Sequence, residues 1–319
     1  MYTDVIRELA DGKSHSVESL ELNESELPRL TAHMVELGIE FQYRRGSLQI
    51  VGGLELLDAD RMRALMDEEA RELLHKIEVH WTIDSTNTYL LKKSQKQACH
   101  AEVSIAEQQT QGRGRRGKNW VSPFGKNLYM SIAWNMPTAG ASVDGLSLAV
   151  GVGVVRGLSA CGVEGVQLKW PNDLLVDGSK LGGILIEVSN PKLERVEVIV
   201  GIGINLQMPH ASGRTIDQNW TDMARVTGTR ISRNLVAAKL LDSLLGMLNT
   251  FPQMGFRSYR REWQGYDAFK DRAVEIHIGN ETVAGIEKGV DDRGALRLQT
   301  EMGIRQFVGG EISLRAART

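Results

Sequence analysis

The strongest chemical signal in the chain is a stretch rich in glycine and arginine, Gln108 to Lys118, with the sequence QQTQGRGRRGK. It comes shortly after a strand-like run, Ala101–Ile105. Glycines let backbone N–H groups approach a ligand closely, and arginines supply planar, permanently charged groups that match carboxylate or phosphate oxygens. The composition of this stretch therefore predicts a loop that binds an anion.

The same stretch contains the glycine spacing of dinucleotide-binding folds, at Gly112, Gly114 and Gly117. That mechanism requires a helix that begins at the motif and receives the pyrophosphate at its N-terminus. Residues 118–125 instead continue as a loop toward the next strand, so we exclude the Rossmann interpretation. On this stretch alone, a solvated basic turn and a nucleic-acid contact remain open alternatives.

A second polar group follows the apolar run Val166–Leu168, and it consists of Lys169, Trp170, Pro171, Asn172 and Asp173. Lys180 comes seven residues later, just before Gly182, Gly183 and another apolar strand. A lysine in this position can hold a phosphoryl oxygen, and the glycines leave room for it. Taken alone, the first of these segments is an ordinary strand-to-turn junction.

Two further segments place small polar residues at the ends of strand-like runs. Glycines alternate in Gly201–Asn205, a pattern that often marks the close approach of a ligand or a backbone. Asn205 could contact a nucleotide base, or it could serve as a turn amide bonded to nearby backbone. Ser85, Thr86 and Asn87 follow the run Val79–Ile83, and they could form a polar wall or the N-cap of a helix, which local sequence favours.

We find no sequence motif that indicates another class of active site. The 7 histidines do not occur at metal-ligand spacing, and the sequence contains neither a nucleophile elbow nor a P-loop, so we expect no protein-bound metal. The 2 cysteines form no CxxC pair, which favours buried thiols in a reducing compartment. With no apolar leader, no stretch long enough to cross a bilayer and a net charge of -2, we expect a cytoplasmic protein that does not bind membranes.

Hydrophobic periodicity predicts an α+β protein of several units. Residues 1–57 combine apolar helical spacing near 5–9, 17–20 and 27–37 with a strand hairpin near 39–51, which is typical of a winged helix-turn-helix. Residues 58–76 are predicted to form one linking helix, and 77–269 a mixed-sheet domain with helices near 146–158 and 235–248. Residues 270–319 contain short β runs separated by glycine turns, which predict a small SH3-like barrel.

Taken together and in this order, these motifs resemble those of bacterial biotin protein ligases, in particular the bifunctional type that also represses a biotin operon. The resemblance covers residues 77–319, including the C-terminal VGGEISLR, and in outline the N-terminal winged helix. It implies a central domain of the biotin/lipoate ligase type. By this resemblance, biotin attacks the α-phosphate of MgATP to give biotinyl-5′-AMP, and a lysine of the biotin carboxyl carrier protein of acetyl-CoA carboxylase then displaces AMP.

The resemblance also assigns roles to individual residues. Biotin would be bound by Ser85, Thr86, Asn87, Gln109, Arg113, Gly114, Arg115 and Lys180, of which Arg115 and Lys180 would be catalytic. The adenylate would be bound by Trp120, Lys169, Asn172, Asp173, Asn205 and Trp220. Mg²⁺ would arrive on the ATP phosphates with few protein ligands, and a homodimer could form when the adenylate is bound.

The N-terminal segment departs from the pattern of a DNA reader. Residues 1–45 contain 5 basic and 9 acidic side chains, a formal charge of about -4. Its predicted recognition helix includes Glu24, Glu26 and Pro28; acidic side chains oppose phosphate binding, and a proline past the first turn would disturb the helix. We therefore expect weak or absent operator binding, with phosphate contacts limited to Arg29, Arg44 and Arg45. The competing functions are a lipoate–protein ligase and a regulator dominated by repression.

Overall fold

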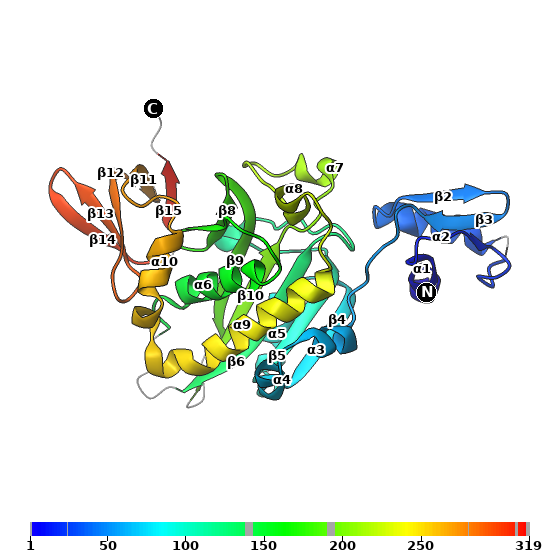
Figure 1. The fold of residues 1–319 in the computed structure, drawn as a ribbon, viewed down its shortest axis with the longest axis horizontal. Coiled ribbons are helices and arrows are strands. Elements are labelled where there is room, and N and C mark those ends of the chain that lie inside the picture. The colour runs from blue at the N-terminus through cyan, green and yellow to red at the C-terminus, as the bar shows by residue number, and fades with distance from the viewer. Residues whose placement is uncertain are drawn as a thin grey trace.

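A mixed sheet of seven strands forms the centre of the molecule in the computed structural model, which describes residues 2–23, 25–137, 143–189, 195–279, 281–309 and 312–316 (Figure 1). The strand order is β4-β5-β6-β10-β9-β8-β7, and β4 and β5 are the parallel pair. The strands are β4 (Lys76–Ile83), β5 (Glu102–Gln109), β6 (Leu128–Pro137), β7 (Gln167–Lys169), β8 (Asp173–Val176), β9 (Ser179–Ser189) and β10 (Arg195–Ile204).

Helices cover both faces of this sheet. On one face, the long helices α6 (Leu146–Ser159) and α9 (Arg233–Met254) pack together over Ile132, Val198 and Val200. Gly153 allows this contact, because a Cβ there would lie 2.8 Å from Leu244 Cδ2. On the other face, α5 (Thr86–Ser94) packs over Ala133 and Ile199, since alternate strand residues point to opposite sides.

The linking helix predicted for residues 58–76 is wrong. The segment forms two short helices, α3 (Ala59–Leu65) and α4 (Glu68–Leu73), separated by extended backbone at Met66 and Asp67. Asp67 N–H donates to Asp242 of α9 at 2.9 Å, and Met62 and Met66 are buried in the main core. These helices therefore belong to the central domain, and the apolar stripe that suggested one helix faces α9.

In its described residues, 2–23 and 25–50, which exclude Glu24, the N-terminal region forms two helices and a three-stranded sheet, in place of the predicted three helices and hairpin. Its elements are α1 (Thr3–Leu9), β1 (His15–Ser16), α2 (Glu26–Glu36), β2 (Phe41–Arg44) and β3 (Ser47–Ile50). Residues 17–21 form turns instead of a helix. They follow directly after Ser16, where the pairing of β1 with β3 ends. Pro28 lies within the first turn of α2, where a missing N–H costs no helical bond, so the expected disturbance is also wrong.

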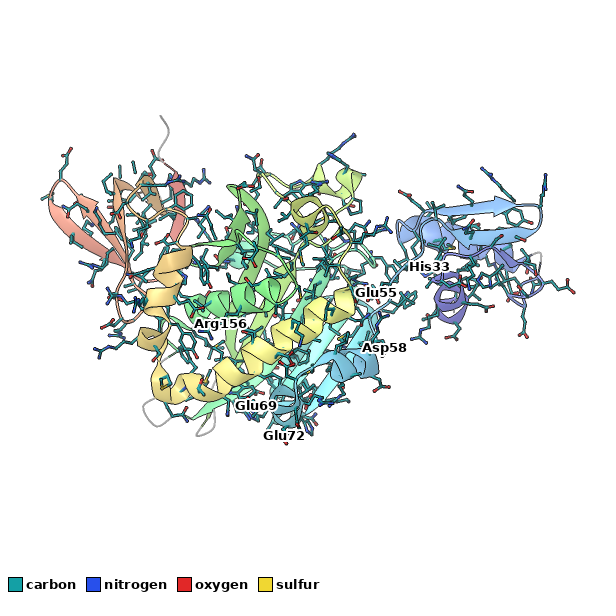
Figure 2. The ribbon with its side chains drawn as sticks, viewed as in Figure 1. His33, Glu55, Asp58, Glu69, Glu72 and Arg156 are labelled. Carbon is teal, nitrogen blue, oxygen red and sulfur yellow. The ribbon has the colours of Figure 1, made fainter. Side chains whose placement is uncertain are left out.

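The linker after β3 is bound tightly to the central domain. Figure 2 shows Glu55 and Asp58 between the N-terminal region and the beginning of α9. The Glu55 carboxylate accepts hydrogen bonds from the Ser232 hydroxyl (2.5 Å) and from Arg233 N–H (2.6 Å). Phe124 of the central domain is buried in the same hydrophobic cluster as Leu9 and Leu48 of the N-terminal region. This junction is therefore part of the folded structure.

The C-terminal region is an antiparallel sheet in the order β14-β13-β12-β11-β15, at the opposite end of the molecule from the N-terminal region (Figure 1). It confirms the small β domain expected there. Its strands are β11 (Ala273–Ile278), β12 (Glu281–Val290), β13 (Leu296–Thr300), β14 (Gly303–Phe307) and β15 (Ile312–Ala316). The Trp170 indole donates to Gly294 O at 3.1 Å, which ties this sheet to the central domain.

Short helices complete the connections: η1 (Arg115–Gly117), α7 (His210–Gly213), α8 (Met223–Thr227), η2 (Phe256–Ser258) and α10 (Arg260–Tyr266). Among the described residues, no helix has both the length and the apolar composition needed to cross a membrane.

Candidate functional site

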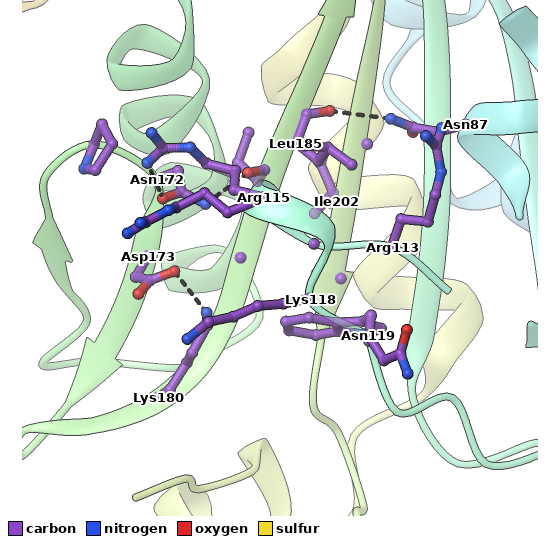
Figure 3. Close-up of a pocket in the computed structure, with 18 of the residues that line it drawn as sticks. Asn87, Arg113, Arg115, Lys118, Asn119, Asn172, Asp173, Lys180, Leu185 and Ile202 are labelled. Carbon is purple, nitrogen blue, oxygen red and sulfur yellow. Dashed lines mark hydrogen bonds and ion pairs between the residues drawn. The ribbon is translucent and has the colours of Figure 1, made fainter. Parts of the chain in front are cut away.

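A cavity of about 830 Å³ opens on the α5 face of the central sheet (Figure 3). Its walls come from the start of α5, the loop after β5, the β7–β8 turn, β9, β10 and the end of β15. Segments far apart in the sequence therefore meet in one hollow, as the order of motifs suggested.

Three glycines on this face of the sheet make room for side chains that line the cavity. Gly183 of β9 pairs with Gly203 of β10, and Gly201 lies two residues before Gly203 on the same face. A Cβ at Gly201 would lie 2.2 Å from the Asn87 carboxamide oxygen, and one at Gly203 would lie 2.5 Å from the Trp120 ring. The predicted close approach is thus made by side chains of the protein itself.

One end of the cavity is a neutral, fully hydrogen-bonded polar wall. Ser85 caps α5 by accepting from Thr88 N–H at 3.4 Å, which confirms the N-cap interpretation, and it also lines the cavity. Gln109 Oε1 accepts from Thr86 N–H (2.9 Å) and from its hydroxyl (3.2 Å). Beneath them, the buried Ser131 hydroxyl lies 2.7 Å from Thr86 Oγ1.

Asn87 is fixed in orientation on the same wall. Its Oδ1 lies 2.5 Å from the Ser131 hydroxyl, and its Nδ2 donates to Leu185 O (3.2 Å) and to the Glu187 carboxylate (2.8 Å), the first of these bonds being visible in Figure 3. Arg113 also binds Glu187, at 2.7 Å, so its charge is balanced within the protein. Its guanidinium fastens the loop to β9.

The glycine–arginine loop forms a small closed turn. Gly114 N–H donates to Lys118 O at 2.7 Å, and Trp120 N–H donates to Gly112 O at 2.8 Å. Within it, Arg115–Gly117 forms only a 3₁₀ turn, with Arg116 at a φ of 58°. No α-helix begins at the motif, and the exclusion of a Rossmann site is therefore confirmed.

The other end of the cavity is cationic. Arg115 donates to the Asn172 carboxamide oxygen at 3.0 Å, and Lys180 Nζ lies 2.6 Å from Asp173 Oδ1 (Figure 3). Burial lowers the pKa of Arg115, and burial likewise lowers the pKa of Lys169. Among the described residues, seven basic and two acidic side chains line the cavity, so it carries an excess of positive charge that suits a polyanion.

Two of the residues expected to bind the adenylate do not line the cavity. Asn205 is buried and donates to Thr221 O at 3.0 Å, a contact to neighbouring backbone. The Trp220 indole donates to Gly213 O at 3.0 Å, and the Arg225 guanidinium stacks over its ring at 4.1 Å. The other expected residues all line it: Ser85, Thr86, Asn87, Gln109, Arg113, Gly114, Arg115, Trp120, Lys169, Asn172, Asp173 and Lys180.

Several residues that line or support this cavity were not predicted from the sequence. Ser131 lies inside an apolar strand and Glu187 at the polar end of another, so neither carries a local signal. Arg315 reaches the cavity from β15, a contact that only the folded chain creates, while Asp217 comes from an irregular segment. The residues considered for DNA, Arg29, Arg44 and Arg45, are exposed in the N-terminal region and remote from this cavity in sequence.

Comparisons with known proteins agree with this geometry. The model of the biotin/lipoate A/B protein ligase family matches residues 79–205, and that of the biotin protein ligase C-terminal domain matches residues 271–315. The bifunctional ligase/repressor BirA of Salmonella typhimurium is 36% identical over 314 residues, covering 97% of this chain and 96% of that protein.

Two further proteins are similar over about three quarters of the chain. The biotin–[acetyl-CoA-carboxylase] ligase of Mycobacterium tuberculosis is 31% identical, covering 76% of this chain and 93% of that protein. The solved structure of biotin protein ligase from Aquifex aeolicus in complex with biotin and ATP has a TM-score of 0.66 at 27% identity, covering 76% of this chain and 100% of that one.

Proposed function

The chain belongs to the biotin protein ligase family and is a biotin–[acetyl-CoA-carboxylase] ligase of the BirA type, and from this premise we propose how its cavity works. The cavity binds biotin at its polar wall and ATP at its cationic end, and it joins them as biotinyl-5′-AMP. The bound biotin and ATP named for the Aquifex aeolicus relative support both substrates.

The polar wall suits the uncharged ureido ring of biotin. Thr86, Asn87 and Gln109 present donors and acceptors whose orientations are set by bonds to one another and to Ser131. Such a preorganised wall binds a neutral ring without the cost of ordering side chains. The Arg113 guanidinium lines the same cavity and binds Glu187, so we assign it to holding the loop against β9 beside the bound biotin.

The cationic end suits the carboxylate and the triphosphate, which are both anions. As the carboxylate oxygen attacks the α-phosphorus and pyrophosphate leaves, negative charge moves across the phosphoryl oxygens. Arg115 and Lys180 face this region and stabilise that charge, and Lys169 adds to it from β7. Where a cavity excludes part of the water, fixed charges of this kind stabilise the phosphoryl charge more than they would in bulk water.

Mg²⁺ fits this arrangement only as a companion of the nucleotide. The carboxylates that line the cavity in the described part of the chain are Asp173 and Asp217, and Asp173 is already paired with Lys180. When bound, the ion would neutralise phosphate charge, and Asp217 is the lining carboxylate left to contact it or its waters.

In the second step, the amine of a lysine on the carrier protein attacks the biotinyl carbonyl and AMP leaves. The acceptor in acetyl-CoA carboxylase is supported by the name of the Mycobacterium tuberculosis relative. Trp120 lies against Gly203 and extends the loop over the sheet, so it helps to keep water from the mixed anhydride.

The observation that carries this proposal is the meeting of the polar wall and the cationic cluster in one cavity. Arg115→Ala and Lys180→Ala are each expected to lower biotin-dependent ATP–pyrophosphate exchange about a hundredfold or more. Arg257→Ala and Lys96→Ala, which remove exposed charges elsewhere, serve as matched controls. Near-normal exchange in both cavity variants would contradict the assignment.

We further propose that operator binding is weak, although repressors occur among the relatives. Residues 1–45 carry a formal charge of about -4, and α2 begins with an acidic residue, Glu26, so phosphates would meet repulsion. A tight, salt-dependent and sequence-specific complex with operator DNA in the presence of biotin and ATP would refute this. A homodimer induced by the adenylate also stays a prediction, testable by sedimentation with and without both substrates.

A further inference from the structure

A second cavity lies at the junction between the N-terminal region and the central domain. It has a volume of about 400 Å³ and shares no lining residue with the adenylation cavity. Its walls are the linker 52–55, the loop residues 125–126 and the segment 230–233 that leads into α9. Any ligand here would contact the N-terminal and central parts of the chain at the same time.

The walls of this cavity are basic. They contain Arg61, Lys126, Arg230 and Arg233 against one acid, Glu55. Two of these five charges are already satisfied, because Glu55 accepts three hydrogen bonds from residues 232–234 and Arg233 is bound to Glu107 at 2.6 Å. Arg61 is a third, because its guanidinium forms an ion pair with Glu55 at 3.9 Å. The uncompensated charge therefore belongs to Lys126 and Arg230.

Lys126 is half-buried, and its side chain makes no hydrogen bond or ion pair with the described residues. Burial lowers its pKa, and Glu40, the acid that opposes this effect, is not in contact with it. Among the described residues, the partners of Arg230 are neutral: its guanidinium donates to Gly52 O at 3.3 Å and, with the Gln207 carboxamide turned so that its oxygen faces Arg230, to that oxygen at 2.8 Å from Nε. Two cations thus line one cavity without a carboxylate between them.

A half-buried ammonium without a contacting counter-ion is costly, and among the described residues the only opposing charge is that of Glu40, which does not contact it. Contact with water is enough to stabilise the charge of an exposed lysine such as Lys96. It is not enough for Lys126, which is half-buried beside Arg230 and Arg233. An oxyanion with several oxygens can accept from an ammonium and a guanidinium together, with short, charge-assisted hydrogen bonds.

We propose that this junction cavity is a binding site for a phosphate group, held between Lys126 and Arg230. The bound anion would bridge the loop after Phe124 to the linker through Arg230 and Gly52, and so would stabilise the junction. The phosphate group could be free inorganic phosphate, or it could be part of a nucleic-acid backbone that reaches the junction.

The test uses the full chain and inorganic phosphate, titrated at constant ionic strength and followed by calorimetry and by the melting temperature. Because phosphate can also enter the adenylation cavity, the titration is repeated in Lys126→Met, Arg230→Gln and Lys180→Met. Saturable binding that survives Lys180→Met but weakens about tenfold or more in Lys126→Met and Arg230→Gln supports the site. Lys96→Met is the matched control, and Lys126→Arg should retain binding.

Phosphate binding of equal strength in Lys126→Met and in the unaltered chain would overturn the proposal, as would the absence of any saturable binding beyond that lost in Lys180→Met. If Lys126→Met fails to fold, Arg230→Gln and Lys126→Arg still decide the outcome. A short DNA duplex of arbitrary sequence then distinguishes the sources: competition with phosphate that depends on Lys126 indicates a nucleic-acid backbone, and its absence indicates the free anion.

Discussion

At the junction with the N-terminal region, a buried arginine meets a buried glutamate. Arg233 lies 2.6 Å from Glu107, and its guanidinium also donates to Asn127 O at 2.9 Å and to Glu55 O at 2.9 Å. Glu107 in turn accepts from Leu57 N–H at 2.5 Å. Glu107 belongs to β5, two residues before Gln109 of the polar wall, so this junction adjoins the biotin end of the cavity.

At the junction with the C-terminal sheet, a buried glutamate lies beside a half-buried aspartate. Asp267 follows α10, Glu287 lies in β12, and a side-chain oxygen of each has no donor among the described residues. Burial raises the pKa of Glu287 to about 8, with the charge of Asp267 adding to the effect, and burial also raises the pKa of Asp267. Ala268 N–H donates to Leu168 O, beside Lys169, so this junction adjoins the phosphate end.

The difference shows two ways of fixing an added region to a catalytic domain. Opposite charges hold the first junction at any pH near neutrality. The second depends on a proton shared by two acids, with the nearby charges of Lys270 and Asp271 contributing to the balance. We therefore expect alkaline pH to weaken the C-terminal junction first.

The largest effect is expected from Arg233→Leu, which leaves the Glu107 carboxylate buried without its partner. Breaking such a pair costs about 3–5 kcal/mol of unfolding free energy. Urea unfolding at neutral pH measures it, and Arg257→Leu, an exposed arginine, is the matched control. A loss of less than about 1 kcal/mol would show that the ion pair does not hold this junction.

A smaller effect with the opposite sign is expected from Glu287→Gln. Because the folded pKa of Glu287 is raised from 4.5 to about 8, its stabilising contribution is complete below about 4.5 and is lost as pH rises through about 8. The amide cannot ionise and can donate to Asp267, so the variant should exceed the natural chain in stability by roughly 1–3 kcal/mol above pH 8. Unfolding at several pH values tests this, and a difference that does not change with pH contradicts a shared proton.

The smallest effect is expected where the C-terminal junction meets the cavity. Lys169→Met should raise the KM for ATP about tenfold, equivalent to about 1.4 kcal/mol, and leave the KM for biotin nearly unchanged. Lys169 lies 6.0 Å from the Phe269 ring at this junction, so the variant also reports whether the junction serves the phosphate end. An equal rise in the KM for ATP and the KM for biotin would show that Lys169 does not act at the phosphate end of the cavity alone.

The motifs that meet in the cavity were predictable because each joins a strand to a loop of unusual residue types. The alternating Gly201 and Gly203 predicted a close approach to one face of the sheet, which Asn87 and Trp120 make, and Arg115 and Lys180 predicted an anion site. Ser131 and Glu187 were not predictable, because their partners lie on other strands and a serine or glutamate in a strand has many ordinary uses.

The wrong predictions about the fold have similar causes. The turn at residues 17–21 contains apolar residues at helical spacing, but the pairing of His15 with Leu48 decides its shape. The break at Met66 and Asp67 comes from a hydrogen bond to Asp242, 175 residues away. The spacing of apolar residues within one segment cannot predict contacts between residues far apart in the sequence. The position of Arg315 of β15 at the cavity could not be predicted for the same reason.

The most direct test of the proposed biotin adenylation is to supply the full chain with ATP labelled in its α-phosphate and with either biotin or lipoate. The products are then separated. We predict a labelled biotinyl adenylate that is consumed when a purified biotin carboxyl carrier domain is added, with one biotinyl group found on its lysine by mass spectrometry. An adenylate formed with lipoate but not with biotin, or no adenylate with either acid, would contradict it.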